Sequence, residues 1–317
     1  MQTKQFGKTG MQITPVGLGA WAIGGNHGAH GWGPQDDQES IKTIQRALDL
    51  GINWIDTAAV YGLGHSEMIV GKAIKGRERP YIFTKCSQIW DERGNVGHSL
   101  KADSIRREVE ASLKRLDIDA IDLYQIHWPL PDPDIEEGWS TLAELKKEGK
   151  VRHIGVSNFN VKQLRRAEQI TPVETLQPPY SLIRPDVEQD ILPYCQQHTV
   201  GVIVYSPMAS GLLTGAMSRE RIANLPDDDW RRTNREYQEP CLSRNLALTN
   251  LLAEIGKARH VTAAVVAIAW TLHNPAVTAA IVGSRHPGQV EETIAAAEFS
   301  LSESEYEQIG QFVVAHP

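Results

Sequence analysis

Four residues suited to proton transfer stand at or just after the ends of consecutive apolar runs. Asp56 ends one run and Tyr61 lies in the loop that follows it, while Lys85 and His127 end the next two runs. Taken singly, each has a common structural explanation as a cap, an ion pair or a surface group. A carboxylate, a phenol, an ammonium group and an imidazole at neighbouring run ends together predict a catalytic site.

The chemistry that this set favours is delivery of a proton to an oxygen that gains negative charge. A tyrosine hydroxyl has an ordinary pKa near ~10, which is high for proton exchange at neutral pH. We expect the Lys85 cation to lower the pKa of Tyr61. Asp56 would keep Lys85 charged, because a lone ammonium in a dry site is costly. His127 would orient a carbonyl oxygen while hydride reaches the carbon.

The elements that must position these groups alternate between short apolar runs and amphipathic stretches. The helical patterns show apolar residues at a spacing of three or four, and some end at a glycine. They are Gln38–Leu50, Ser104–Leu116, Glu137–Glu148, Val161–Gln169, Asp186–His198 and Pro287–Ala297. The strand candidates are Val16–Ala20, Asn53–Thr57, Tyr81–Lys85, Ile121–Ile126, His153–Val156, Glu174–Gln177, Val200–Tyr205 and Val277–Val282.

Strands that alternate with helices imply a parallel sheet joined by right-handed crossovers. An open doubly wound sheet could use the same pattern. The number of strand candidates, eight, and the weak glycine motif after the first run both favour a (β/α)8 TIM barrel. Gly17-Leu18-Gly19 leads to Trp21 and not into a helix. Catalytic groups of a barrel project from the C-terminal strand ends, where the four residues above stand.

Several segments lie outside the repeat. Lys4–Thr14 is predicted to be an N-terminal β-hairpin that closes the bottom of the barrel, and Gly211–Ser243 is a long polar stretch of the kind that is often functional. Arg244–Arg259 and Thr262–His273 are two helical patterns before the last strand, so one of these C-terminal helices is extra. We expect residues 1–317 to form a single domain.

Composition excludes several classes of protein. The net charge of -7 comes from mixed charges without a basic block, which argues against nucleic acid as a partner. No signal-peptide core and no run of ~20 apolar residues occurs, which argues against a membrane partner. The three cysteines, Cys86, Cys195 and Cys241, are widely spread and are expected to be free thiols. We therefore expect a cytoplasmic protein.

The same residues resemble the motifs of the aldo-keto reductase family, and the resemblance runs from the hairpin to the last helix. It is closest to bacterial general-stress-protein-type members and to potassium-channel β subunits. It rests on Asp56-Thr57-Ala58-x-x-Tyr61-Gly62 with Ser66-Glu67 and Gly71, Thr84-Lys85, the segment Asp122–Pro129, Gly155-Val156-Ser157-Asn158-Phe159, and Gln177-Pro178-Pro179-Tyr180.

The resemblance implies a reversible NADP(H)-dependent reduction of aldehydes and ketones. Tyr61 would be the general acid, Lys85 and Asp56 would tune it, and His127 would direct the substrate. Ser157, Asn158 and Gln177 would hold the carboxamide, Tyr205 the nicotinamide ring, and residues 206–212 the pyrophosphate. The helix starting at Pro287 would receive the 2'-phosphate with Arg285. The whole implied cofactor set is Ala20, Trp21, Asp56, Ser157, Asn158, Gln177, Tyr205, Ser206, Pro207, Met208, Gly211, Leu212, Arg231, Gly283, Ser284, Arg285, Gln289 and Glu292.

Two positions depart from the general-stress type. Ala216 stands where many members have a phosphate-binding lysine, and Thr293 stands where many have asparagine. The arginine of the following loop is matched by Arg231, with Arg232 one residue away. We therefore expect NADP(H) to be preferred and NAD(H) to be less strongly excluded than in those members.

A small carbonyl compound is the expected substrate, in a pocket formed by Trp21, Trp32, Trp90 and Trp128. For Trp32 and Trp90, packing at the rim is an equally good interpretation. His27 and His30 resemble a metal pair but lack a third ligand, so no metal is expected.

The sequence pattern is also compatible with one alternative function and argues against another. The first alternative is a cofactor-binding sensor or regulatory subunit of the channel-β type with little turnover. The second is a metal-dependent barrel hydrolase, which would need ligand pairs at the strand ends that are absent from the sequence. We expect a monomer or a weak homo-oligomer.

Overall fold

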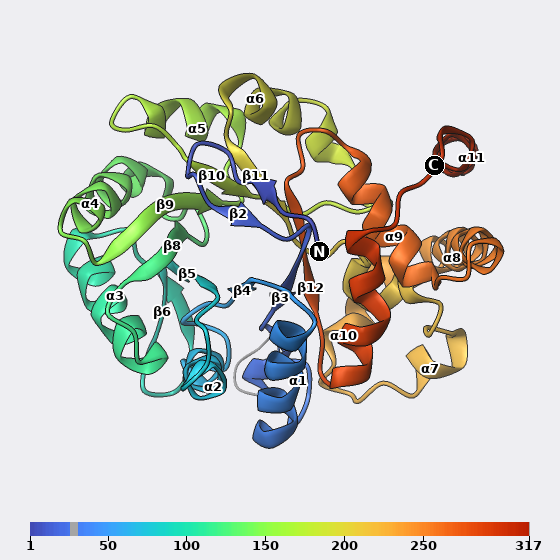
Figure 1. The fold of residues 1–317 in the computed structure, drawn as a ribbon, viewed down its shortest axis with the longest axis horizontal. Helices are drawn as coiled ribbons and strands as arrows, with labels where there is room; N and C mark the ends of the chain where they lie inside the picture. The colour runs from blue at the N-terminus through green and yellow to red at the C-terminus, as the bar shows by residue number, and fades with distance from the viewer. Residues whose placement is uncertain (26–30, 317) are drawn as a thin grey trace.

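Eight parallel strands close into a barrel in the computed structural model, which describes residues 1–25 and 31–316. Each predicted apolar run overlaps one barrel strand, and the pairing of the last strand with the first excludes the open sheet. Figure 1 shows the strands at the centre with helices around them. The strands are β3 (Val16–Gly19), β4 (Trp54–Asp56), β5 (Tyr81–Cys86), β8 (Ile121–Ile126), β9 (Val151–Ser157), β10 (Thr175–Gln177), β11 (Gly201–Val204) and β12 (Ala279–Gly283).

The helices bury one face against the barrel and expose the other. In α3 (Ala102–Leu116) the buried side chains Ile105, Val109 and Leu116 recur at helical spacing. The helix α1 (Asp37–Asp49) begins where the Asp36 carboxylate accepts a hydrogen bond from the Glu39 amide at 2.8 Å. The remaining helices of the repeat are α2 (His65–Ile74), α4 (Ile135–Lys147), α5 (Val161–Glu168), α6 (Ile191–His198) and α10 (Pro287–Thr293).

An N-terminal hairpin closes one end of the barrel, as the sequence predicts. Strands β1 (Lys4–Gln5) and β2 (Gln12–Ile13) pair antiparallel and lie across the barrel in Figure 1. Phe6, which directly follows β1, packs on Phe83 of β5, with ring centroids 5.8 Å apart. In β3, Gly17 leaves room for the Trp54 indole, which a Cβ would approach to 2.1 Å. The bottom of the barrel is therefore filled with aromatic side chains.

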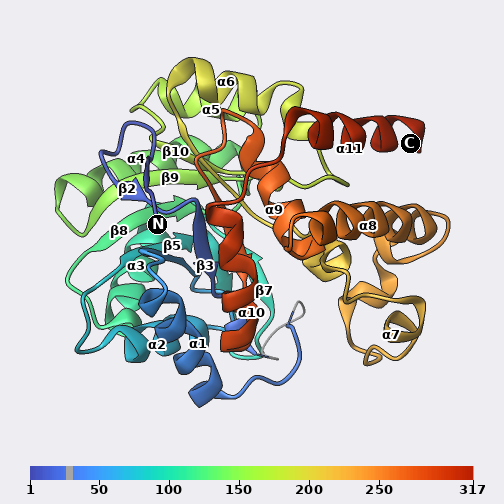
Figure 2. The ribbon, with the colours of Figure 1, turned by 45° about the vertical axis from the view of Figure 1, so that its right-hand side comes forward.

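The predicted long segment after β11 is built of short helical turns. They are the 3-10 turns η4 (Ala209–Thr214), η5 (Trp230–Thr233) and η6 (Arg235–Tyr237) and the short helix α7 (Arg219–Ala223). Two helices, α8 (Cys241–Ala258) and α9 (Ala263–His273), precede β12, and α11 (Glu303–Ala315) follows α10 near the C-terminus. Figure 2 shows α7, α8 and α11 on one side of the barrel, which confirms that the C-terminal part carries extra helices.

Some elements were not predicted from the sequence. They are α2, α11, and a small antiparallel pair formed by β6 (Gln88–Trp90) and β7 (Val96–His98). Helix α2 lacks an amphipathic pattern because most of its residues are buried. The predicted helix Asp186–His198 begins as a 3-10 turn, η3 (Asp186–Glu188), and becomes α-helical only at Ile191. None of the helices in residues 1–25 and 31–316 combines the length and the apolar composition that a membrane span requires.

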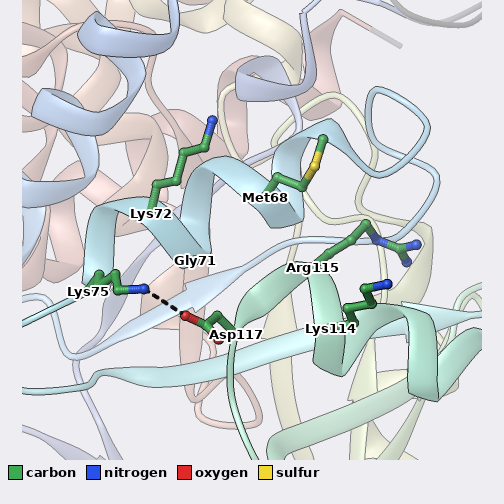
Figure 3. A pocket seen from close by; sticks show the side chains of 7 residues that line it. All are labelled: Met68, Gly71, Lys72, Lys75, Lys114, Arg115 and Asp117. Carbon is green, nitrogen blue, oxygen red and sulfur yellow. Dashed lines mark hydrogen bonds and ion pairs between the residues drawn. The ribbon is translucent and has the colours of Figure 1, made fainter.

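The close contact of α2 with α3 leaves a basic hollow on the outer wall of the barrel (Figure 3). A Cβ on Gly71 would come within 2.7 Å of the Leu116 carbonyl oxygen, so the helix contact depends on this glycine. Around the hollow, Lys75 pairs with Asp117 and Arg115 pairs with Glu67. None of the predicted site residues lines it.

Candidate active site

A buried ion pair joins the ends of β4 and β5. The Lys85 ammonium donates to the Asp56 carboxylate at 2.6 Å and to the Thr57 carbonyl at 2.8 Å. Both side chains are almost fully buried. Burial raises the pKa of Asp56 and lowers the pKa of Lys85, and each charge opposes the shift of the other. The charged form of each side chain is therefore stabilised by its hydrogen-bonded partner.

Tyr61 and His127 lie beside this pair, as the sequence predicts for neighbouring strand ends. The Lys85 Nζ is 3.5 Å from the Tyr61 hydroxyl and 5.1 Å from the ring centroid. The His127 ring meets the Tyr61 ring edge to face, with centroids 5.7 Å apart. Burial and the Lys85 charge hold the pKa of His127 well below its ordinary range, so the imidazole is neutral at pH 7.

The pKa of Tyr61 moves in the direction opposite to the one expected from the sequence. Burial raises it well above 10, and the negative charge of Asp56 adds to the shift. The Lys85 charge does not outweigh these two effects, because it is matched by a carboxylate at 2.6 Å and the phenol is desolvated. Tyr61 is therefore a protonated phenol at neutral pH, which suits a proton donor.

Further buried polar groups bond to Thr57 and Thr84, the chain neighbours of Asp56 and Lys85. Glu67 is fully buried and accepts hydrogen bonds from Thr84 and Arg115, each at 2.6 Å. Ser66 donates to the Ala20 carbonyl at 2.8 Å and bonds with the Thr57 hydroxyl at 3.0 Å. The resemblance includes Ser66 and Glu67, but their contacts with the strand ends could be found only from the structure.

The residues implied in carboxamide binding form one network that reaches the ion pair. The Gln177 amide donates to the second Asp56 oxygen at 2.8 Å. Asn158, held at φ 62°, donates to the His127 carbonyl at 2.9 Å and accepts from the Tyr205 hydroxyl at 2.8 Å. Ser157 donates to the Gln177 carbonyl at 2.8 Å. The two halves of the predicted site are therefore continuous.

The backbone after β11 turns sharply through several left-handed conformations. Ser206, Ser210 and Gly211 have φ values of 57°, 56° and 96°. The Tyr237 hydroxyl shares its one proton between the carbonyl oxygens of Ala209 and Ser210, at 3.0 and 2.8 Å. Leu212 and Pro207 are buried, whereas Met208 is half-buried. This loop is held in place by a side chain that the sequence did not single out.

Arg285, the residue implied in phosphate binding, has no carboxylate partner within the described chain. Its guanidinium bonds to the Gln35 side chain at 2.8 Å and to the Pro34 carbonyl. Burial and the nearby charge of Arg231 lower the pKa of Arg285. Arg231 is held by Asp229, whereas Arg232 bonds to Asp227 and to the Leu225 carbonyl. The structure thus brings Arg231, and not Arg232, toward Arg285.

The other residues of the implied cofactor set surround β12 and β3. The Ala20 amide donates to the Asp56 carbonyl at 2.8 Å. Ser284 is buried after Gly283, and Gln289 accepts from the Arg285 amide at 2.7 Å. Glu292 and Ala216 are exposed, and Thr293 bonds back to the Gln289 carbonyl at 2.8 Å.

The four tryptophans expected in the substrate pocket separate into two groups. Trp21 stacks beside Tyr61 at 6.2 Å and meets Trp32 at 5.3 Å. Trp90 lies instead beside Arg115, and Trp128 is 38% exposed. Trp230, which sequence reasoning missed, stacks on Trp21 at 6.1 Å. Its position next to Arg231 in the long polar segment was the only available signal.

The expectation about metal binding is tested only in part. Among residues 1–25 and 31–316, no group of three or more His, Cys, Asp or Glu side chains is arranged to hold a metal ion. His27 and His30 lie outside the described residues.

The chain is similar to aldo-keto reductases along almost its whole length. The family model "Aldo/keto reductase family" matches residues 15–313. The aldo-keto reductase YhdN of Bacillus subtilis is 40% identical over 92% of this chain and 87% of its own. The NADH-specific methylglyoxal reductase of Escherichia coli is 35% identical over 96% of both chains. The structure of the glycerol dehydrogenase AKR11B4 from Gluconobacter oxydans superposes with a TM-score of 0.91, at 36% identity, over 99% of this chain and 96% of that one.

Proposed function

We propose that this chain, which belongs to the aldo/keto reductase family, reduces aldehydes and ketones to alcohols with NADP(H), using Tyr61 as the general acid. The observation that carries the proposal is the protonated Tyr61 phenol 3.5 Å from a buried lysine that is itself paired with Asp56. Such a group can give up a proton only to a strongly basic oxygen that forms close to it. A carbonyl oxygen becomes that base as hydride is added to its carbon.

Each residue of the set has a separate part in the proton transfer. Tyr61 donates its proton to the carbonyl oxygen, and the bond to the hydroxyl hydrogen breaks as the alcohol forms. Lys85 then stabilises the resulting phenolate, and Asp56 and the Thr57 carbonyl keep the ammonium aimed at it. The neutral His127 imidazole carries one N–H donor with which it orients the carbonyl. In the oxidative direction Tyr61 accepts the proton.

The donor set fits a dinucleotide with an extra phosphate. Among the residues that the structure describes, Arg285 is half-buried near Arg231 and has no carboxylate partner, an arrangement that an anion would stabilise. Ser157, Asn158 and Gln177 would hold the carboxamide, Tyr205 would stack on the ring, and the loop from Ser206 to Leu212 would follow the pyrophosphate. When bound, the reduced nicotinamide supplies the hydride. Gly283, Ser284, Gln289 and Glu292 would surround the adenosine end.

The preference between the two dinucleotides is part of the proposal. The related enzyme of Escherichia coli is described as NADH-specific. In this chain Arg285 supports binding of a 2'-phosphate, while Ala216 offers no charge where a lysine is common. We therefore propose that NADP(H) is preferred and that NAD(H) is also used.

A turnover assay tests the proposal against the sensor alternative. Purified protein would be incubated with a panel of aldehydes and ketones and an excess of NADPH or NADH, and the alcohol would be quantified. Many moles of alcohol per mole of protein are expected, and more with NADPH at low cofactor concentration. Tight NADPH binding with at most one equivalent of alcohol would instead identify a binding protein of the channel-β kind.

A further inference from the structure

Residues 32–36, which lead into helix α1, reach Arg285 just after β12. The Gln35 amide bonds to this arginine twice. Its nitrogen donates to the Arg285 carbonyl at 2.8 Å, and its oxygen accepts from the Arg285 Nε at 2.8 Å. The Pro34 carbonyl accepts from Nη2 of the same guanidinium. The Gln35 side chain therefore holds both the backbone and the side chain of Arg285.

These contacts use one edge of the Arg285 guanidinium and leave the other edge unpaired. The Nε hydrogen and one Nη2 hydrogen point to Gln35 and Pro34. Within residues 1–25 and 31–316, Nη1 makes no hydrogen bond, and Arg285 is only half-buried. A guanidinium edge with two parallel N–H groups has the shape that binds a phosphate through two hydrogen bonds. The edge formed by Nη1 and Nη2 therefore suits such an anion.

The segment that holds this arginine is itself anchored on both sides. On one side, Trp32 meets Trp21 edge to face at 5.3 Å. On the other side, Asp36 caps helix α1, which lies next to α10 in Figures 1 and 2. Arg46 of α1 pairs with Glu291 of α10 at 2.7 Å, and α10 begins two residues after the arginine. The segment is therefore fixed relative to the arginine by contacts besides its own hydrogen bonds.

The partners of Arg285 are neutral, in contrast to the partner of the nearby Arg231. Arg231 donates to both carboxylate oxygens of Asp229, at 2.9 and 2.5 Å. Gln35 and Pro34 offer an amide and a carbonyl oxygen, which orient the guanidinium without neutralising it. Binding to a side chain that is already held costs less conformational entropy than ordering a free one. The contacts thus prepare Arg285 for an anion.

We propose that Gln35 is a specificity-determining positioning residue, which holds Arg285 so that its unpaired edge receives the 2'-phosphate of NADP(H). The preference for NADP(H) over NAD(H) then depends on Gln35 as well as on Arg285. A carboxylate at position 35 would neutralise the arginine and repel the phosphate, which a neutral amide does not. This inference rests on the proposed function, because it concerns the orientation of an arginine in the proposed cofactor site.

The experiment measures the dissociation constants of NADPH and NADH for wild type, Gln35→Ala and Gln35→Glu. Gln35→Ala is expected to raise the constant for NADPH by about five-fold, the effect of ordering one long side chain on binding. Gln35→Glu keeps an acceptor for Nε but adds a negative charge, and is expected to raise that constant on the order of 10- to 100-fold. The constant for NADH should stay unchanged in both variants.

Gln38 is the matched control. It is exposed on α1 and makes no hydrogen bond in the part of the chain that the structure describes. Gln38→Ala and Gln38→Glu make the same two chemical changes three residues away, and they should leave both constants at the wild-type values.

Arg285→Ala, measured beside these variants, separates the inference from the proposed function. A selective loss of NADPH affinity in Arg285→Ala with wild-type constants in both Gln35 variants would overturn the inference alone. Tighter NADPH binding in Gln35→Ala would also overturn it, because Gln35 would then compete with the phosphate. An equal loss for NADPH and NADH in the Gln35 variants would show a merely structural role. Unchanged constants in Arg285→Ala would overturn the phosphate assignment of the proposed function together with the inference.

Discussion

The two sides of the candidate site are organised by different means. On the catalytic side, at the ends of β4, β5 and β8, charged side chains are buried and bond directly to one another. Asp56, for example, is 3% exposed and accepts from both Lys85 and Gln177. On the cofactor side, the loop after β11 contains left-handed backbone, and Arg231 and Arg285 are half-buried. There Arg285 bonds to a carbonyl and an amide, both neutral groups.

This difference indicates which side of the site has its charges balanced before any ligand binds. The catalytic side already balances its charges, since a carboxylate and an ammonium are matched inside the barrel. The cofactor side holds two cations near each other, and within residues 1–25 and 31–316 only Arg231 has a carboxylate partner. An anionic ligand would supply the missing charge. The catalytic side should therefore govern stability and rate, and the cofactor side should govern affinity.

The largest effect is expected from breaking the buried pair with Asp56→Asn. Lys85 would be left buried without a counter-charge, which costs about 3–5 kcal/mol in the free energy of unfolding. Carbonyl reduction should fall by a factor on the order of 10²–10⁴. Urea unfolding and steady-state kinetics measure the two effects. The same change at Asp117, whose partner Lys75 is 77% exposed, is the control and should leave both unaltered. If Asp56→Asn and Asp117→Asn lost the same free energy of unfolding and the same activity, the special role of the buried pair would be contradicted.

A smaller and selective effect is expected from Arg285→Ala on the cofactor side. Losing a charged hydrogen bond to phosphate should raise the dissociation constant of NADPH roughly 10- to 100-fold. The constant for NADH, which lacks that phosphate, should change little. Fluorescence titration with both dinucleotides measures this, with Arg232→Ala as the control because Arg232 bonds to Asp227. A parallel loss for NADPH and NADH would show that Arg285 does not read the phosphate.

The smallest of these effects concerns a carboxyl group behind the catalytic side. Burial raises the pKa of Glu108 from 4.5 to about 7, and its carboxylate accepts from the Ser87 amide at 2.9 Å. The folded protein thus holds this proton more tightly than the unfolded chain. The contribution of Glu108 to the free energy of unfolding should be fully present below pH 4.5. It should be lost as the pH rises toward 7, a change on the order of 2 kcal/mol.

Glu108→Gln should remove that part of the pH dependence. Urea unfolding at a series of pH values checks this against Glu110→Gln, on the same helix, whose partner Lys150 lies at the surface. If the free energy of unfolding changed with pH in the same way for Glu108→Gln and Glu110→Gln, Glu108 would not be the titrating group.

Much of the catalytic side could be predicted because strand ends are visible in a sequence. Asp56, Lys85 and His127 end apolar runs, and parallel strands bring such ends together. The direction of the Tyr61 pKa could not be predicted, because it depends on how burial and Asp56 outweigh Lys85.

The parts that were missed depend on contacts between distant segments. Gln35 bonds to Arg285 across 250 positions, and no periodicity indicates such a pairing. The same holds for Trp230, which stacks on Trp21 from a loop without a helical or strand pattern. Helix α2 was missed because a helix buried on nearly all sides shows no polar face.

The most direct test of the account is a single-turnover measurement on Tyr61→Phe with NADPH already bound. Mixing with excess aldehyde reports the rate of carbonyl reduction without product release. We expect the rate to fall by a factor on the order of 10²–10⁴, because the proton donor is gone while the ring remains. The dissociation constant of NADPH should stay at the wild-type value. A wild-type rate in Tyr61→Phe would contradict the assignment of Tyr61 as the general acid.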